Sequence, residues 1–332
     1  MYDIEKIYQA KDVPDAIAAL AAAPDAVVIC GGSDVLVKIR EGKLAGCSLV
    51  SIHGLKELAG VRMEDDGTIV IGPATTFAHV TRDPIIERHL PALGAAVDQA
   101  GGPQLRNVGT IGGNVCNGVT SADSASTLLT LNALLELTGP DGRRTVPLCD
   151  FYRGPGKVDL AHGELLTAIR VAKADYEGFG GHYIKYAQRN AMDIATLGCA
   201  VHVKLDAEKR AVEELRLAFG VAAPTPVRCR AAEQAARGKA VSPELFDAVS
   251  EAAAGEVNPR TSWRASRAFR MQLVRELSRR ALKQAIIHQL FSMETLDPSG
   301  IVIIPINNGG IITSLTHQPS LKKLMKTPSS MV

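Results

Sequence analysis

Two short segments, each with a pair of glycines, are the parts of this 332-residue chain best suited to binding a ligand. They are Gly31-Gly32-Ser33-Asp34 and Thr110-Ile111-Gly112-Gly113-Asn114. Each sets two residues without a Cβ beside a hydroxyl and a carboxylate or carboxamide, so backbone N–H groups can approach phosphate oxygens closely. Two such segments acting together would suit a diphosphate.

The first glycine pair stands between two apolar runs. Residues 26–30 read as a buried strand and residues 35–39 as a second strand, which would put the pair in a strand-to-turn connection at a sheet edge. A tight turn that needs a positive φ is the simpler explanation of a glycine pair, and it remains open here.

The second pair lies in a glycine-rich stretch, residues 101–114, that has no apolar periodicity, and we therefore expect neither helix nor strand there. Ordering such a stretch costs backbone entropy and buries little, so a bound ligand could supply the missing stabilisation. Arg106 could add positive charge. Structural turns are again the alternative.

Other ligand signatures are missing from the sequence. It has neither a Gly-x-Gly-x-x-Gly dinucleotide fingerprint nor a Walker motif, and Gly-Pro-Gly-Lys at 154–157 reads as a loop because Val158 stands where a hydroxyl residue is needed. The six cysteines are at least seventeen residues apart, which excludes Cys-x-x-Cys metal or cluster spacing. The eight histidines show no metal-ligand spacing either.

Composition restricts the class of protein further. A net charge of +2 is too small for a nucleic-acid or membrane partner, and no aromatic residues alternate with basic ones. The absence of a signal peptide and of a long apolar run predicts a cytoplasmic protein that does not span a membrane. With 46% hydrophobic residues, the chain should form two or three globular domains.

The pattern of short strands and helices is typical of an α+β protein. Helices are expected at 15–23, 84–99 and 125–131, and three more at 229–238, 243–254 and 263–290. Strands are expected at 47–52, 68–72, 134–138, 144–147, 164–171, 183–188, 195–204 and 215–220, the last three forming a small antiparallel sheet.

At the glycine motifs the sequence resembles a known family. The run Gly-Gly-Ser-Asp, the run Gly-Pro-Gln-Leu-Arg-Asn-Val-Gly-Thr-Ile-Gly-Gly-Asn at 102–114, and Asp123 nine positions later resemble the FAD-binding (medium) subunits of molybdenum hydroxylases. The resemblance extends over residues 1 to about 286, with further matching motifs at 117–124, 185–195 and 217–226. Within the family it is greatest to the bacterial xanthine dehydrogenase type.

The resemblance implies a domain plan. Residues 1–176 would form a two-part FAD-binding domain of the vanillyl-alcohol oxidase/CO dehydrogenase flavoprotein type. Residues 177–290 would form a smaller domain with an antiparallel sheet and three helices. Residues 291–332 depart from the family and would be an atypical tail, in which we find no chemistry.

The resemblance also implies a function. The chain would pass electrons from [2Fe–2S] clusters through FAD to NAD⁺, and because it cannot ligate the other centres, a small [2Fe–2S] subunit and a molybdopterin-binding large subunit would carry them. Substrates such as xanthine, carbon monoxide, nicotinate or aromatic-CoA thioesters would bind the large subunit and cannot be told apart here. A non-catalytic nucleotide-binding or assembly protein is the alternative from another class.

The flavin performs the redox chemistry itself, so we expect binding residues and no catalytic acid, base or nucleophile. Asp123 has the alternative role of capping the helix at 125–131, and Lys185 that of an ordinary lysine on an exposed strand face. The resemblance adds Asp123, Leu165 and Lys185 to a predicted phosphate cradle of Val27, Val28, Ile29, Cys30, Gly31, Gly32, Ser33, Asp34, Gly109, Thr110, Ile111, Gly112, Gly113 and Asn114.

The last helix carries a run of basic residues interleaved with apolar ones at helical spacing. A solvated basic face beside a core stripe explains this pattern, and docking to an acidic partner subunit is the alternative. Reversal of the charges at Arg275 and Arg279 should leave assembly intact if the first explanation holds. The basic residues are Arg264, Arg267, Arg270, Arg275, Arg279, Arg280 and Lys283.

Overall fold

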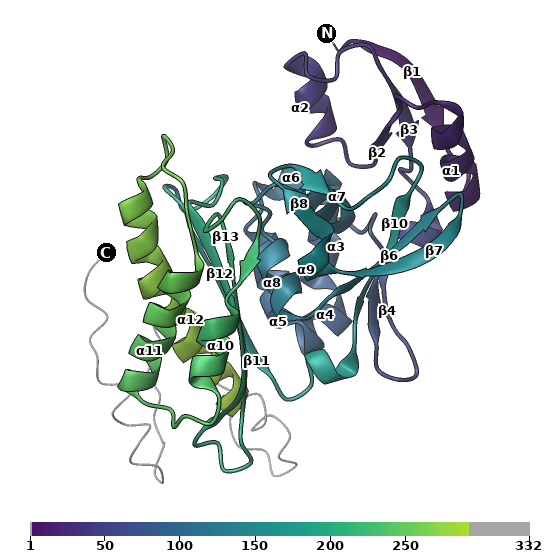
Figure 1. Cartoon of the computed structure of the whole chain (residues 1–332). Coiled ribbons are helices and arrows are strands. Elements are labelled where there is room, and N and C mark those ends of the chain that lie inside the picture. The colour runs from purple at the N-terminus through teal and green to yellow at the C-terminus, as the bar shows by residue number, and fades with distance from the viewer. Residues whose placement is uncertain (1, 292–332) are drawn as a thin grey trace. The chain divides into compact units, whose positions relative to one another are not determined.

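The computed structural model describes residues 2–291, so the predicted tail from residue 292 onward lies outside the described residues. The chain begins with a three-stranded parallel sheet in the order β1-β3-β2 (Figure 1). Helix α1 connects β1 to β2, and the Asp12 carboxylate caps it by accepting from the Asp15 N–H at 2.8 Å. The elements of this part are β1 (Ile4–Gln9), α1 (Val13–Ala22), β2 (Val27–Ile29), α2 (Val35–Arg40), β3 (Cys47–Ser51) and η1 (Lys56–Leu58).

The segment around the first glycine pair differs from the sequence prediction. Residues 35–39 form helix α2, not a strand, with Leu36 N–H bonded to Gly32 O and Lys38 N–H to Asp34 O, both at 3.0 Å. Periodicity cannot separate helix from strand in so short an apolar run. Strand β2 lies at the sheet edge, and its three residues are half-buried instead of buried.

A five-stranded antiparallel sheet follows, in the order β4-β5-β10-β6-β7, with β10 in the centre. Apolar side chains of β6 and β10, including Leu135, Leu137 and Ile169, pack with residues of the helices that follow β5. The elements are β4 (Val61–Met63), β5 (Ile69–Ile71), β6 (Leu134–Gly139), β7 (Gly142–Pro147), α9 (Leu148–Phe151), β8 (Tyr152–Gly154), β9 (Lys157–Val158), β10 (Leu165–Val171) and η2 (Lys173–Asp175).

The helices between β5 and β6 correct two expectations. The single helix expected at 84–99 is two helices, since Leu90 leaves the helical conformation before Pro91. The glycine-rich stretch at 101–114 is mostly helical, because Pro103 and Thr110 each begin a short helix. The helices are α3 (Phe77–Arg82), α4 (Pro84–His89), α5 (Pro91–Asp98), α6 (Pro103–Val108), α7 (Ile111–Cys116) and α8 (Ala125–Thr130).

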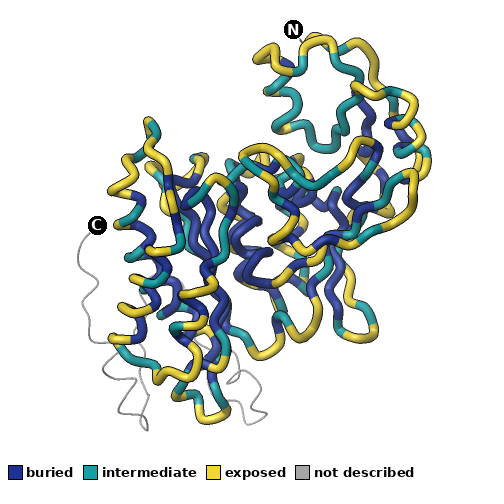
Figure 2. The backbone as a smooth tube through the Cα atoms, in the orientation of Figure 1, coloured by how far each residue is buried: buried dark blue, intermediate teal, exposed yellow. Residues whose placement is uncertain are grey.

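The remaining residues confirm the predicted antiparallel sheet with three helices. The strand order is β11-β12-β13-β14, α12 packs on β11 and β12, and α5 and α8 also pack on the sheet (Figure 1). Figure 2 shows β12 and β13 largely buried, whereas α2 is half-buried or exposed apart from Ile39. The elements are β11 (Gly180–Tyr186), β12 (Leu197–Leu205), β13 (Val212–Gly220), β14 (Val227–Arg228), α10 (Arg230–Ala236), α11 (Pro243–Glu256) and α12 (Arg267–Phe291).

Buried polar residues connect this sheet to α8. Arg216 is 4% exposed, donates to Thr130 O, pairs with Asp175 at 3.0 Å and lies over the Phe179 ring. The His202 ring nitrogen Nδ1 lies 2.9 Å from Thr130 Oγ1. A charge that is buried and paired is costly to disrupt, so this network should hold the sheet on α8.

The His202 side chain should make the fold less stable in mild acid. Burial, followed by the nearby Arg216, lowers its pKa to about 3, so the folded protein binds fewer protons than the unfolded chain below the ordinary pKa of 6.5. Stability is then lost as the pH falls, by about 2 kcal/mol between about pH 6.5 and pH 5. Urea unfolding of wild type and His202→Asn across this range checks it; a difference between the two that does not change with pH would contradict it.

Candidate functional site

The two glycine segments meet in the structure. A methyl group placed on Gly31 would lie 1.7 Å from Val108 O and 3.3 Å from Gly109 N, so the two backbones pack closely only because residue 31 has no side chain. Burial raises the pKa of the neighbouring Cys30 thiol, while a hydrogen bond with Thr110 opposes that shift. The segments that sequence analysis paired are therefore adjacent.

The first segment keeps free hydrogen-bond donors. Within residues 2–291, the N–H groups of Gly32, Ser33 and Asp34 meet no acceptor. Gly32 has a φ of +71°, a left-handed conformation that glycine adopts readily. Such a loop, immediately before a helix, is suited to binding an anion.

The second segment has fewer free donors than predicted. The N–H groups of Ile111 and Gly112 are bonded to Thr75 O at 3.0 Å and Pro73 O at 2.8 Å, and the Gly113 N–H donates to Thr110 Oγ1 at 3.1 Å. Within the described part of the chain, only the Thr110 N–H of residues 109–114 meets no acceptor. The glycines have a packing reason as well, since a methyl group on Gly112 would lie 2.4 Å from the Pro73 side chain.

Asn114 connects the second segment to Ser124, the residue that follows Asp123. Its carboxamide oxygen accepts from the Ser124 hydroxyl at 2.7 Å and from the Ser124 N–H at 3.2 Å. Ser124 is the N-cap position of α8, and no side-chain bond caps that helix. The Asp123 carboxylate therefore does not cap α8, which was the alternative to a ligand role.

Asp123 and Lys185 form a buried ion pair, with Lys185 Nζ 3.0 Å from Asp123 Oδ2. The Lys185 side chain is only 5% exposed, so it does not lie on a solvated strand face, and Nζ also donates to Gln99 O at 2.8 Å. Burial raises the pKa of the Asp123 carboxyl, and the Lys185 ammonium opposes that shift.

Tyr183 is a member of this group that sequence reasoning missed. Its hydroxyl donates to Asp123 Oδ1 at 3.1 Å, and the side chain is buried. Burial and the adjacent carboxylate raise its pKa well above the ordinary value. Because Tyr183 and Lys185 are two residues apart on one strand, their side chains share a face, and this alternation was the signal available in the sequence.

A cavity of about 270 Å³ lies against the Lys185 side chain. Gln99 lines one part of it, and the end of β11 with the loop that follows lines the rest, including Tyr186, Arg189 and Met192. The lining is largely polar. The ion pair and this cavity together could receive a polar aromatic group.

Leu165 lies elsewhere. Its side chain is 2% exposed and packs in a core cluster that Val28 and Cys30 also contact. It therefore packs against the strand that precedes the first glycine segment. The structure does not bring Leu165 to the cavity beside Lys185.

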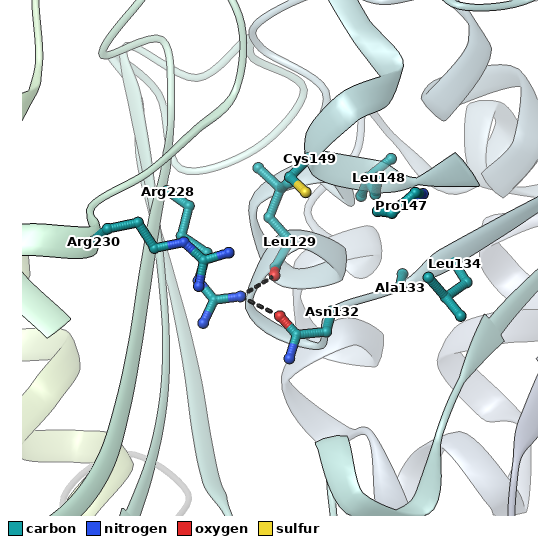
Figure 3. A pocket seen from close by; sticks show the side chains of 9 residues that line it. All are labelled: Leu129, Asn132, Ala133, Leu134, Pro147, Leu148, Cys149, Arg228 and Arg230. Carbon is teal, nitrogen blue, oxygen red and sulfur yellow. Dashed lines mark hydrogen bonds between the residues drawn. The ribbon is translucent and has the colours of Figure 1, made fainter. Parts of the chain in front are cut away.

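A second cavity, of about 200 Å³, is shown in Figure 3. Its lining is mostly apolar, and it includes Leu148, Cys149 and Arg228. The Arg228 guanidinium is already bonded to Leu129 O and the Asn132 carboxamide (Figure 3) and also pairs with Glu233. It therefore has little hydrogen-bonding capacity left for a ligand.

The described residues show neither a metal site nor a membrane-spanning helix. No group of three or more His, Cys, Asp or Glu side chains between residues 2 and 291 is arranged to hold a metal ion. In the same part of the chain, no helix is both long and apolar enough to cross a bilayer.

Comparison with known proteins identifies the family. Residues 2–173 match the family described as FAD binding domain in molybdopterin dehydrogenase, and residues 182–285 match the CO dehydrogenase flavoprotein C-terminal domain. The chain is 46% identical over 286 residues to a xanthine dehydrogenase FAD-binding subunit of Escherichia coli O157:H7, covering 86% of this chain and 97% of that one. It is 32% identical to the carbon monoxide dehydrogenase medium chain of Hydrogenophaga pseudoflava, covering 83% and 94%.

A solved structure agrees with the sequence relatives. Carbon monoxide dehydrogenase from Hydrogenophaga pseudoflava superposes with a TM-score of 0.82 at 31% identity, covering 87% of this chain and 99% of the matched chain. This confirms the expected α+β fold of an FAD-binding part followed by a sheet with helices. The chain belongs to the FAD-binding subunits of the molybdenum hydroxylases.

Proposed function

We propose that this chain holds FAD in a xanthine dehydrogenase-like molybdenum hydroxylase and passes electrons from [2Fe–2S] clusters on a partner subunit to NAD⁺. The observation that carries the proposal is the loop of free amides at Gly32, Ser33 and Asp34, pressed against the second glycine segment through Gly31. A diphosphate needs several donors at short range, and this loop supplies three N–H groups that no acceptor of the described residues uses.

The first segment would bind the diphosphate more strongly than the second. Its three amides are unused, whereas Ile111 to Asn114 have donated theirs to the protein. The second segment would contribute the Thr110 N–H and the glycine surface that lets the diphosphate lie close to the backbone. Val27, Val28, Ile29 and Leu165 would support the cradle by forming and backing the strand that leads into it.

The Asp123–Lys185 pair would orient the rest of the cofactor. When bound, the flavin supplies the redox chemistry, accepting single electrons and giving up a hydride. With both groups ionised the pair has no net charge, so Lys185 alone does not make the site strongly positive. Tyr183, by donating to Asp123, would hold the carboxylate in one position.

The proposed substrate and electron acceptor are inferred from the similarity of this chain to its relatives. The 46%-identical relative is named a xanthine dehydrogenase subunit, while others are named for carbon monoxide or nicotinate, and the substrate would bind the molybdopterin-binding large subunit. We propose xanthine and NAD⁺, with a cytoplasmic complex that also contains a small [2Fe–2S] subunit. We also propose that the FAD-binding domain ends near residue 176, between the two matched family regions.

The purified chain, expressed with its two partner subunits, tests the proposal. We expect flavin absorbance at about one FAD per chain, bleaching when NADH is added without oxygen, and xanthine-dependent reduction of NAD⁺. Protein without flavin that also fails to bind added FAD would refute the FAD role and favour a non-catalytic assembly protein. Flavin that xanthine reduces but NADH does not would refute only the acceptor.

A further inference from the structure

The arginines of α12 and of the loop before it fall into two groups that the sequence could not separate. In the middle of the helix, Arg275 pairs with Glu251 at 2.9 Å and Arg279 pairs with Asp247 at 2.7 Å, both on α11. These partly exposed ion pairs link α12 to α11. Arg270 is buried, 2% exposed, and donates to Ser262.

The other group lies in the loop before α12 and at the first residue of that helix, and it has no acidic partner among the described residues. Within residues 2–291, the guanidinium groups of Arg260, Arg264 and Arg267 form no ion pair, and Arg264 instead lies over the Trp263 ring, 4.2 Å from its centroid. Trp263 is 78% exposed. An exposed tryptophan beside unpaired arginines is unusual on a free surface and common at the centre of protein interfaces.

The loop after β11 continues this surface. The Tyr186 ring meets the Phe269 ring edge-on with centroids 5.7 Å apart, and Gln188 donates to Arg264 O at 3.0 Å. Met192 is 63% exposed and lines the cavity together with Tyr186. We call this surface the docking patch, defined by Tyr186, Met192, Trp263, Arg264, Arg267 and Phe269.

The charge of the docking patch determines the kind of partner. Residues 186–194 and 258–270 contain five arginines and a single acidic residue, Asp193, which is itself paired with Arg189. The excess of positive charge together with exposed aromatic rings calls for a surface that is acidic and has apolar side chains. The whole chain has a net charge of only +2, so the charge is local and does not indicate nucleic acid.

We propose that the docking patch binds an acidic, apolar surface of the small [2Fe–2S] subunit. This rests on the proposed function, because that subunit is the expected electron donor. Tyr186 and Met192 belong both to the patch and to the wall of the cavity against Lys185, so a chain bound there would lie beside the proposed flavin site.

Binding of the full-length chain to the purified small subunit, measured by biolayer interferometry, tests the proposal. We expect the charge reversal Arg264→Glu with Arg267→Glu to weaken binding about 30-fold or more, as loss of a central arginine contact does. We expect Trp263→Ala, which removes an exposed side chain, to weaken it at least about tenfold. Wild-type binding should fall as salt rises.

The matched control is Arg275→Glu with Arg279→Glu, the same charge change farther along the chain, in the middle of α12. We expect it to leave the dissociation constant unchanged, although it removes two exposed pairs worth about 0.2–1 kcal/mol each. Thermal melting and FAD content are measured for every variant. Absence of wild-type binding, an unaffected patch variant, or an equal loss in the control would each overturn the docking patch. Chain that binds the subunit but lacks flavin would overturn the proposed function instead.

Discussion

Replacing Gly31 with alanine should abolish FAD binding and destabilise the parallel sheet at the start of the chain. The added methyl group would lie 1.7 Å from Val108 O, a backbone atom that cannot rotate away as a side chain can. The two glycine segments must then separate, which moves the free amides of the first away from the second. Overpacking of this kind costs about 1–3 kcal/mol. FAD per chain after purification and the urea midpoint measure the two effects.

Gly154→Ala provides the matched control for this variant. A methyl group on Gly154 meets no atom within 4 Å, and its φ is not positive, so the substitution should change neither FAD content nor the urea midpoint. Wild-type FAD content and stability in Gly31→Ala would show that the close approach of the two segments is unimportant.

Asp123→Ala should be the most destabilising substitution in the site. It leaves the Lys185 ammonium, on a side chain that is 5% exposed, without its carboxylate. Removing one partner of a buried pair costs about 3–5 kcal/mol, because the remaining charge is uncompensated. The double variant Asp123→Ala with Lys185→Met should therefore recover part of the loss, and urea unfolding of all four proteins measures the coupling. If the double variant loses as much unfolding free energy as the two single variants together, the two side chains do not stabilise each other and the ion pair is contradicted.

Lys185→Met should have a pH signature of its own. Burial already raises the pKa of the Asp123 carboxyl above its ordinary 3.8, and removal of the ammonium that opposes this shift should raise it further. The folded state then holds the proton more tightly than the unfolded chain, so stability falls as the pH rises from about 4. As the pH rises from about 4, the free energy of unfolding should fall more for Lys185→Met than for wild type. Plots of unfolding free energy against pH that run parallel for the two proteins would contradict this prediction.

The sequence predicted the elements whose signals are local. Asp83-Pro84 marked a helix start, and in the structure the Asp83 carboxylate accepts from the Ile85 N–H at 2.9 Å. The long strands at 197–205 and 212–220 were also recognised, as 195–204 and 215–220, and most of their residues are buried.

The errors arose where distant contacts decide the local structure. The stretch at 101–114 looked irregular, yet Thr75 O and Pro73 O accept two of its N–H groups and so help to fix the start of α7. Similarly, nothing near Lys185 in the sequence reveals that the Lys185 side chain is buried and paired with Asp123. The two glycine motifs correctly predicted which segments lie together. Which of their backbone N–H groups stay free of protein acceptors depends on contacts with distant residues.

A crystal structure of the chain soaked in excess FAD tests the central claim most directly. We expect the diphosphate oxygens to lie within hydrogen-bond distance of the Gly32, Ser33 and Asp34 N–H groups, beside Thr110, with the flavin ring near the Asp123–Lys185 pair. Density for FAD at another place, or a loop whose amides are closed off by side chains, would contradict it.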